Sequence, residues 1–219
     1  MDGSSNWRTL RRTAILAAAG LVWAMLLAPG AQAEPIRILA FGDSLTAGQG
    51  LGRLESFPAK LQVALTERGH DVEVIDAGVS GDTTRGGAER LDWALQDKPD
   101  LVILELGAND ALRGVSPFET KASLAAMLRK LKERGVAVLL AGMRAPPNLG
   151  PKFGEEFDRI YPDLAAEFGV DLYPFFLEGV AADPSLNLSD GMHPNAKGVD
   201  RIVEGIVGPV IEIIGRLRD

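Results

Sequence analysis

The residues that could act in catalysis include a histidine and an aspartate in one short polar stretch near the end of the chain. Asp190 and His193 are three residues apart, in the stretch Leu-Ser-Asp-Gly-Met-His-Pro over residues 188–194. A neutral imidazole is the usual base that takes the proton of a nucleophilic hydroxyl. A carboxylate on its other nitrogen fixes the tautomer and stabilises the imidazolium. This pair therefore indicates nucleophilic catalysis, for which the chain must also supply a hydroxyl.

The candidate nucleophile is Ser44, in the stretch Phe-Gly-Asp-Ser-Leu-Thr-Ala-Gly over residues 41–48. An apolar run over residues 36–41 precedes it and reads as a buried strand. A serine there lies at the carboxyl edge of a parallel sheet, where ligands bind. The other histidine, His70, precedes the second apolar run and so falls at the opposite edge, where we interpret it as a surface residue. The predicted triad is Ser44, Asp190 and His193.

Attack on an ester carbonyl also needs donors for the oxyanion that forms. The sequence offers the backbone N–H groups of Ser44 and Gly81 and the side-chain amide of Asn109, each in a glycine-rich loop. Each motif alone has an ordinary explanation as a turn, a strand exit or a helix start. Their joint occurrence in loops at one predicted edge favours catalysis. No His-Glu-x-x-His motif is present, and two distant histidines disfavour a zinc hydrolase, so we expect no metal or cofactor.

Alternating short apolar runs and amphipathic stretches must position these residues. The predicted strands span residues 36–41, 72–76, 101–106, 136–141 and 170–173. Right-handed crossovers between them predict a three-layer α/β/α sandwich with a flavodoxin-like five-stranded parallel sheet in the order 2-1-3-4-5. In that order the loops carrying Ser44, Gly81, Asn109 and His193 converge. The apolar spacing also predicts a helix around residues 157–168, with a kink at Pro162.

The first 33 residues read as a secretory leader. Three arginines precede an apolar run over residues 14–28, and Ala31-Gln32-Ala33 has the pattern of a cleavage site. An uncleaved membrane anchor is the alternative, although the run is short for a spanning helix. The formal net charge of −7 argues against nucleic acid and anionic membranes as partners. The chain has no cysteine, so thiol catalysis is excluded. The catalytic domain is expected over residues 34–219.

The four loop motifs together resemble those of the SGNH (GDSL) hydrolases. They are Gly-Asp-Ser-Leu at 42–45, Ser-Gly-Asp at 80–82, Gly-x-Asn-Asp at 107–110 and Asp-x-x-His-Pro at 190–194. The likeness runs from about residue 36 to residue 206. Within the family it points to the bacterial periplasmic thioesterases, lysophospholipases and arylesterases. The resemblance implies the same triad and the same three oxyanion donors.

The resemblance also implies a substrate class. Such family members hydrolyse acyl esters, acyl thioesters and lysophospholipids without a metal, and the loop after the fourth strand shapes the acyl site. Its residues here are Pro146, Asn148, Leu149 and Gly150. A small-molecule ester is therefore the expected partner of a monomeric, exported protein, periplasmic or secreted. Two alternatives stay open: a polysaccharide deacetylase with the same triad, and a non-catalytic protein that binds phosphate or glycan at residues 42–48.

Overall fold

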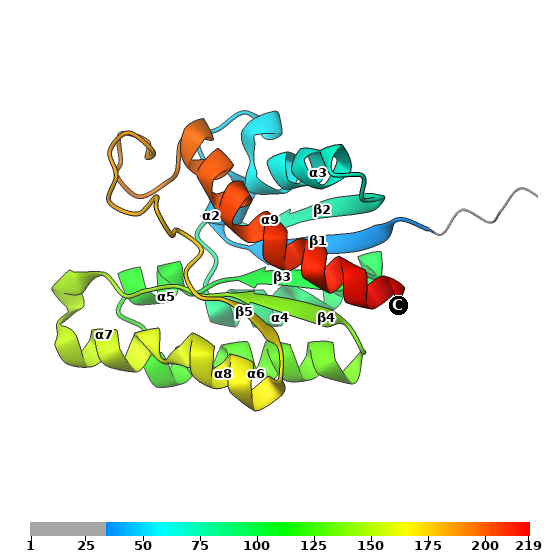
Figure 1. Cartoon of the computed structure of the whole chain (residues 1–219). Coiled ribbons are helices and arrows are strands. Elements are labelled where there is room, and N and C mark those ends of the chain that lie inside the picture. The colour runs from blue at the N-terminus through cyan, green and yellow to red at the C-terminus, as the bar shows by residue number, and fades with distance from the viewer. Residues whose placement is uncertain (1–33) are drawn as a thin grey trace, which may run out of the picture. The chain divides into compact units, whose positions relative to one another are not determined.

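A computed structural model describes residues 34–219 as a five-stranded sheet covered by helices on both faces (Figure 1). The predicted leader, residues 1–33, lies outside the described residues. All strand pairs are parallel, and the order is β2-β1-β3-β4-β5, which confirms the predicted topology. The strands are β1 (Ile36–Gly42), β2 (Val72–Gly78), β3 (Leu101–Glu105), β4 (Ala137–Ala141) and β5 (Asp171–Tyr173).

Two groups of helices form the outer layers (Figure 1). On one face α3 (Phe57–Glu67) packs against α9 (Ala196–Arg218). On the other face α6 (Pro117–Glu133) packs against both α4 (Thr84–Ala94) and α8 (Ile160–Phe168). Short helices fill the loops: α2 (Ser44–Ala47), η1 (Arg53–Glu55), η2 (Leu95–Asp97), α5 (Ala108–Leu112), η3 (Pro147–Leu149) and α7 (Pro151–Asp158). None of the helices within residues 34–219 has the length and apolar character needed to span a bilayer.

The register of the sheet aligns the ends of its central strands. Gly42, at the end of β1, pairs with Gly78 on one side and with Glu105 on the other. Glu105 in turn pairs with Ala141, at the end of β4. The loops that follow these four strands therefore leave the sheet at one level. All five residues of β3 are buried, as expected for a central parallel strand covered on both faces.

The helix predicted around residues 157–168 is divided, but not at Pro162. Helix α7 ends at Asp158 and α8 begins at Ile160, with Arg159 between them. Pro162 falls in the first turn of α8, where a backbone N–H has no intrahelical partner to lose. In one continuous helix Pro162 could not donate to the Asp158 carbonyl, and its ring would clash with that carbonyl. The break at Arg159 therefore lies where this proline interrupts a helix, and the predicted kink takes the form of a break.

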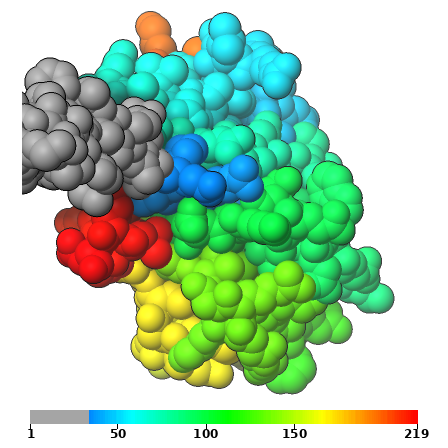
Figure 2. All heavy atoms as spheres, turned by 90° about the vertical axis from the view of Figure 1, so that its right-hand side faces the viewer, coloured from blue at the N-terminus to red at the C-terminus, as the bar shows by residue number. Residues whose placement is uncertain are grey.

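Within residues 34–219, no hydroxyl pairs with an imidazole at the edge of the sheet where the strands begin. Figure 2 faces this edge, where the end of α9 lies beside the start of β1. Arg218 donates to the carbonyl of Asp71, and Arg216 pairs with Asp171. A hollow of about 520 Å³ lies here, lined by apolar side chains together with Lys132, Asp171 and Arg216. It contains no hydroxyl paired with an imidazole.

A buried tyrosine ties the helical layer to the loop after β3. The Tyr161 hydroxyl donates to the carbonyl of Leu106 at 2.9 Å, next to Gly107. Gly107 has φ of +122°, and a Cβ there would overlap that hydroxyl, so the close approach requires glycine. We expect Tyr161→Phe to lower the free energy of unfolding by about 1–3 kcal/mol, because it leaves a buried carbonyl unpaired. Urea unfolding measures this.

Tyr173→Phe is the matched control. Tyr173 is the only other tyrosine in the chain, and its hydroxyl makes no hydrogen bond within residues 34–219. Its replacement should change the free energy of unfolding by less than about 0.5 kcal/mol. Equal losses in the two variants would contradict the role given to the Tyr161–Leu106 hydrogen bond.

Candidate active site

Three residues predicted as a triad lie in hydrogen-bonding contact. Ser44 Oγ is 2.9 Å from His193 Nε2, and His193 Nδ1 is 2.7 Å from Asp190 Oδ2. Ser44 begins α2, directly after β1, whereas the other two lie in the loop before α9. The serine side is buried and the aspartate side is open to solvent: Ser44 is 7% exposed, and the Asp190 side chain is 39% exposed. The arrangement allows the imidazole to accept the hydroxyl proton while the carboxylate holds its other N–H.

Hydrogen bonds within its own turn hold Asp190 ionised. The backbone N–H groups of His193 and Met192 both donate to Asp190 Oδ1, at 3.0 and 2.9 Å. These two bonds, followed by the bond to the His193 ring, lower the pKa of Asp190 from 3.8 to about 2. The carboxylate is therefore charged at any pH near neutrality and can orient the imidazole throughout that range.

The nucleophile turn is built by close contact between β1 and β3. The Asp43 side chain caps α2 by accepting from the N–H of Leu45 at 2.9 Å. Thr46 donates through its hydroxyl to Glu105 Oε2 at 2.7 Å. A Cβ at Gly42 would overlap both the Thr46 hydroxyl and Glu105, so only glycine allows the turn to lie this close to β3.

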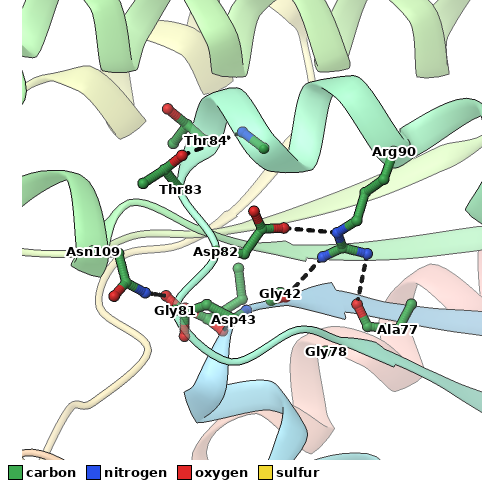
Figure 3. A network of polar contacts seen from close by, with 12 residues as sticks. Gly42, Asp43, Ala77, Gly78, Gly81, Asp82, Thr83, Thr84, Arg90 and Asn109 are labelled. Carbon is green, nitrogen blue, oxygen red and sulfur yellow. Dashed lines mark hydrogen bonds and ion pairs between the residues drawn. The ribbon is translucent and has the colours of Figure 1, made fainter.

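Asn109 and Gly81 approach the serine from the loops after β3 and β2. The Asn109 amide donates one N–H to Asp43 Oδ2 at 3.0 Å, which fixes the side chain (Figure 3). An amide nitrogen has two N–H groups, so one remains for a ligand. The backbone N–H of Gly81 has no acceptor within residues 34–219. Gly81, Asn109 and Ser44 all line one cavity, and the role of oxyanion donor stays a prediction for them.

Two buried carboxyl groups, those of Asp43 and Glu105, lie beside the nucleophile turn, where the Asp43 backbone N–H donates to Glu105 Oε2. Glu105 is fully buried, and burial, followed by the charge of Asp43, raises its pKa well above the usual range. Burial therefore favours the protonated, neutral form of Glu105. Burial is also the largest influence on Asp43 and raises its pKa to about 6, opposed by the hydrogen bonds from Leu45 and Asn109. Asp43 is the charged member of the pair at neutral pH, so Asn109 is held by an anion.

The raised pKa of Asp43 makes a prediction about stability. The folded protein binds this proton more tightly than the unfolded chain does, so the group lowers the free energy of unfolding as pH rises from about 4 to about 6. Above about pH 6 the buried Asp43 is ionised, and its full cost to the free energy of unfolding is present. We expect Asp43→Asn to raise the free energy of unfolding at pH 8 by up to about 2 kcal/mol, because removing the charge releases a penalty of about 3 kcal/mol while the loss of one accepted hydrogen bond costs about 1–3 kcal/mol. Activity should fall at least tenfold, because the new amide cannot accept from both Leu45 and Asn109.

Urea unfolding at pH 4.5 and pH 8, with kinetics on the same samples, checks both parts. The stability gain should be smaller at pH 4.5, where Asp43 is mostly protonated in the folded protein. Asp97→Asn provides the control, since Asp97 is exposed in η2. A variant of Asp43 that loses stability at pH 8, or that keeps full activity, would contradict this account of the carboxyl pair.

The cavity beside Ser44 has a volume of about 530 Å³ and is lined mainly by apolar groups. This size is typical of small-molecule sites. Most of its apolar walls come from the segments after β3, β4 and β5: Ala108, Leu112, Met143, Ala145, Pro146, Pro147, Phe175 and Leu177. Leu45 adds to them from α2. Of the predicted acyl-site residues, Pro146 lines the cavity. Asn148, Leu149 and Gly150 lie further along, in and after η3, and do not line it, so their role stays a prediction.

The sequence motifs did not single out several residues that build this site. Glu105 had a visible signal, because it is the only charged residue in the apolar run at 101–106. Arg90, within α4, gave no signal in the sequence, although its guanidinium donates to the carbonyl of Gly42 at the end of β1. Within residues 34–219, no group of three histidine, aspartate or glutamate side chains is placed to hold a metal ion.

Several known proteins are similar to this chain in sequence and in fold. Residues 40–201 match the GDSL-like Lipase/Acylhydrolase family. Esterase TesA of Pseudomonas aeruginosa is 42% identical over 176 residues, which is 80% of this chain and 88% of that protein. Thioesterase 1/protease 1/lysophospholipase L1 of Escherichia coli (strain K12) is 40% identical over 159 residues, which is 72% of this chain and 75% of that protein.

A solved structure agrees with the sequence relatives. The crystal structure of AlinE4, an SGNH-hydrolase family esterase, is 49% identical and has a TM-score of 0.71. The match covers 84% of this chain and 98% of AlinE4. The family match takes in the turn of Ser44, the loops of Gly81 and Asn109, and the Asp190–His193 turn. The chain belongs to the GDSL-like lipase/acylhydrolase family, the SGNH hydrolases.

Proposed function

We propose that this protein is a serine esterase that hydrolyses carboxylic esters and thioesters through an acyl-enzyme on Ser44. The observation that carries the proposal is the chain of contacts from Ser44 Oγ to His193 and on to Asp190, at 2.9 and 2.7 Å, beside an apolar cavity. The similar proteins named above, an esterase and a thioesterase/lysophospholipase, support the same reaction class.

The reaction proceeds in two halves. Ser44 Oγ attacks the carbonyl carbon while His193 Nε2 takes its proton, and the carbonyl oxygen becomes an anion that Gly81 N–H, Ser44 N–H and Asn109 stabilise. The imidazolium then gives its proton to the departing alcohol or thiol, which leaves the acyl group bonded to Ser44. In the second half a water molecule attacks that ester while the same imidazole takes its proton. The imidazolium then returns this proton to Ser44 Oγ as the bond to the acyl carbon breaks and the carboxylic acid leaves.

The walls of the cavity favour an acyl chain longer than acetyl. Met143, Phe175 and Leu177 present apolar side chains, and burying each methylene of a substrate contributes about 0.8 kcal/mol. Rates on p-nitrophenyl esters of increasing acyl length test this directly. We expect kcat/KM to rise from acetyl to medium chains and to depend on Ser44. Serine-dependent activity confined to acetyl would favour a deacetylase, and absence of activity on every ester would favour a binding protein.

We also propose that the protein is exported and monomeric. The leader pattern ending at Ala33 supports export. Intact mass measured on protein from the periplasmic fraction should correspond to a chain that begins at Glu34. A mass that retains the leader would contradict cleavage, and light scattering tests the monomer.

A further inference from the structure

One arginine in the helical layer connects three segments at the end of the sheet. Arg90 donates from Nε to Asp82 Oδ2 at 2.7 Å, from Nη1 to the Ala77 carbonyl at 3.0 Å and from Nη2 to the Gly42 carbonyl at 2.9 Å (Figure 3). The side chains of the ion pair are largely buried, Arg90 being 19% exposed and Asp82 11% exposed. The contact is therefore shielded from solvent and acts at close range.

The partners of this guanidinium are neighbours of the reacting groups. Gly42 ends β1, two residues before Ser44. Asp82 directly follows Gly81, whose N–H we assign to the oxyanion. The guanidinium therefore fixes the loop that supplies one oxyanion donor relative to the strand that supplies the nucleophile.

Few other contacts hold the Gly81 loop. The N–H of Val79 donates to the Gly42 carbonyl at 3.0 Å, and the N–H of Asp82 closes a turn onto the Val79 carbonyl at 3.0 Å. From the solvent side, Arg113 donates to the Gly81 carbonyl at 2.8 Å. The Asp82–Arg90 ion pair is largely buried, whereas the Arg113 contact with the same loop is exposed.

The three contacts require the shape of an arginine. Its planar guanidinium has five N–H donors in a fixed arrangement, so it serves three acceptors in one plane, whereas a lysine ammonium is a single point on a flexible stem. The group also lies over the Phe41 ring, 3.9 Å from its centroid, which fixes the plane of the guanidinium. A Cβ at Gly86 would overlap the Asp82 carboxylate, so α4 leaves room for this pair.

We infer that Arg90 is a positioning residue for the oxyanion site, setting the Gly81 N–H relative to Ser44 through its contacts with Asp82 and Gly42. The inference rests on the proposed function. A displacement of about 1 Å in a reacting group can cost about a hundredfold in rate, and one misplaced oxyanion donor costs up to about a thousandfold. Most of the apolar walls of the cavity come from the segments after β3, β4 and β5. Substrate binding should therefore change little.

The test compares Arg90→Met with Arg85→Met. The first keeps an apolar stem over Phe41 and removes the three donations, and the second removes an arginine of the same helix whose side chain is 85% exposed. For Arg90→Met we expect kcat on p-nitrophenyl butyrate to fall about 10- to 100-fold. KM should stay within about threefold, and Arg85→Met should match the wild type. Assays run at least 20 °C below the unfolding midpoint of each variant.

A second readout reports the oxyanion site itself. A trifluoromethyl ketone forms a reversible tetrahedral adduct with the active serine, and its oxygen occupies the oxyanion position. Its inhibition constant should rise by the same factor by which kcat/KM falls, because both measure the same stabilisation. A merely destabilised but correctly arranged protein would keep the wild-type inhibition constant while it remains folded.

Asp82→Asn tests the contact between Arg90 and the Gly81 loop apart from the two contacts that Arg90 makes with backbone carbonyls. It preserves the size of the side chain and leaves the two carbonyl contacts of Arg90 in place, and we expect a smaller fall in kcat with unchanged KM. If Arg90→Met does not fold, Asp82→Asn and Arg90→Lys decide by the same criteria. Folded variants with kcat and inhibition constant within twofold of wild type would overturn the inference, as would a change in KM alone. Ser44-dependent activity of the wild type shows separately whether the proposed function holds.

Discussion

Replacing Ser44 by alanine is expected to reduce kcat by about 10⁴- to 10⁶-fold, with KM changed by less than about threefold. The residue supplies the oxygen that becomes acylated, and within residues 34–219 no other hydroxyl shares its contact with His193 Nε2 at 2.9 Å. The apolar walls of the cavity remain in the variant, so substrate binding persists. Steady-state hydrolysis of p-nitrophenyl butyrate measures both constants.

Stability should be nearly unaffected by this change. The lost contact is one hydrogen bond between a serine that is 7% exposed and an imidazole that keeps its bond to Asp190. The unfolding midpoint should therefore remain within about 2 °C of the wild type. Ser116→Ala serves as the control, because Ser116 is exposed and its side chain makes no capping hydrogen bond. Folded Ser44→Ala protein with more than about 1% of wild-type kcat would contradict its role as nucleophile.

Replacing Asn109 by alanine is the second large effect, an expected loss of about 10²- to 10³-fold in kcat with little change in KM. The amide donates to Asp43 at 3.0 Å, so it stands ready before the substrate arrives and needs no reorganisation as the oxyanion forms. Removing it also takes a hydrogen bond from Asp43, which raises the pKa of that carboxyl further. The same ester kinetics measure the loss.

Gln96→Ala is the control for Asn109→Ala. Gln96 is an exposed amide in η2 and does not line the cavity. We expect its kinetics to match the wild type. A rise in KM with unchanged kcat in Asn109→Ala would assign the amide to substrate binding, and a loss below about fivefold would remove it from the oxyanion site.

The fold and the meeting of the four loops could be predicted because both depend on local pattern and chain topology. Apolar runs of strand length marked β1 and β3, and right-handed crossovers then fixed the order of the sheet. Once that order is set, parallel strands must end at one edge. The residues that follow β1, β2 and β3 are therefore neighbours before any side chain is placed, and the loop before α9 joins them.

The supports of the site could not be predicted in the same way. The contact between Arg90 and Gly42 depends on how far a long side chain reaches from one layer to another, and residue spacing carries no such information. The pairing of Glu105 with Asp43 depends on the sheet register, which sets Glu105 beside Gly42. The break at Arg159 differs, because Pro162 announces it in the sequence: a proline cannot donate to the carbonyl four residues earlier, at Asp158.

The central claim is that Ser44 is acylated with His193 as its base. Treating the protein with a p-nitrophenyl alkylphosphonate and measuring intact mass, then mapping the adduct by peptide mass spectrometry, tests it most directly. The account predicts one phosphonyl group per chain, on Ser44, with stoichiometric release of p-nitrophenol. Ser44→Ala should remain unlabelled, and His193→Ala should be labelled at least a hundredfold more slowly. A folded, unlabelled wild type, or an adduct on another residue, would contradict the account.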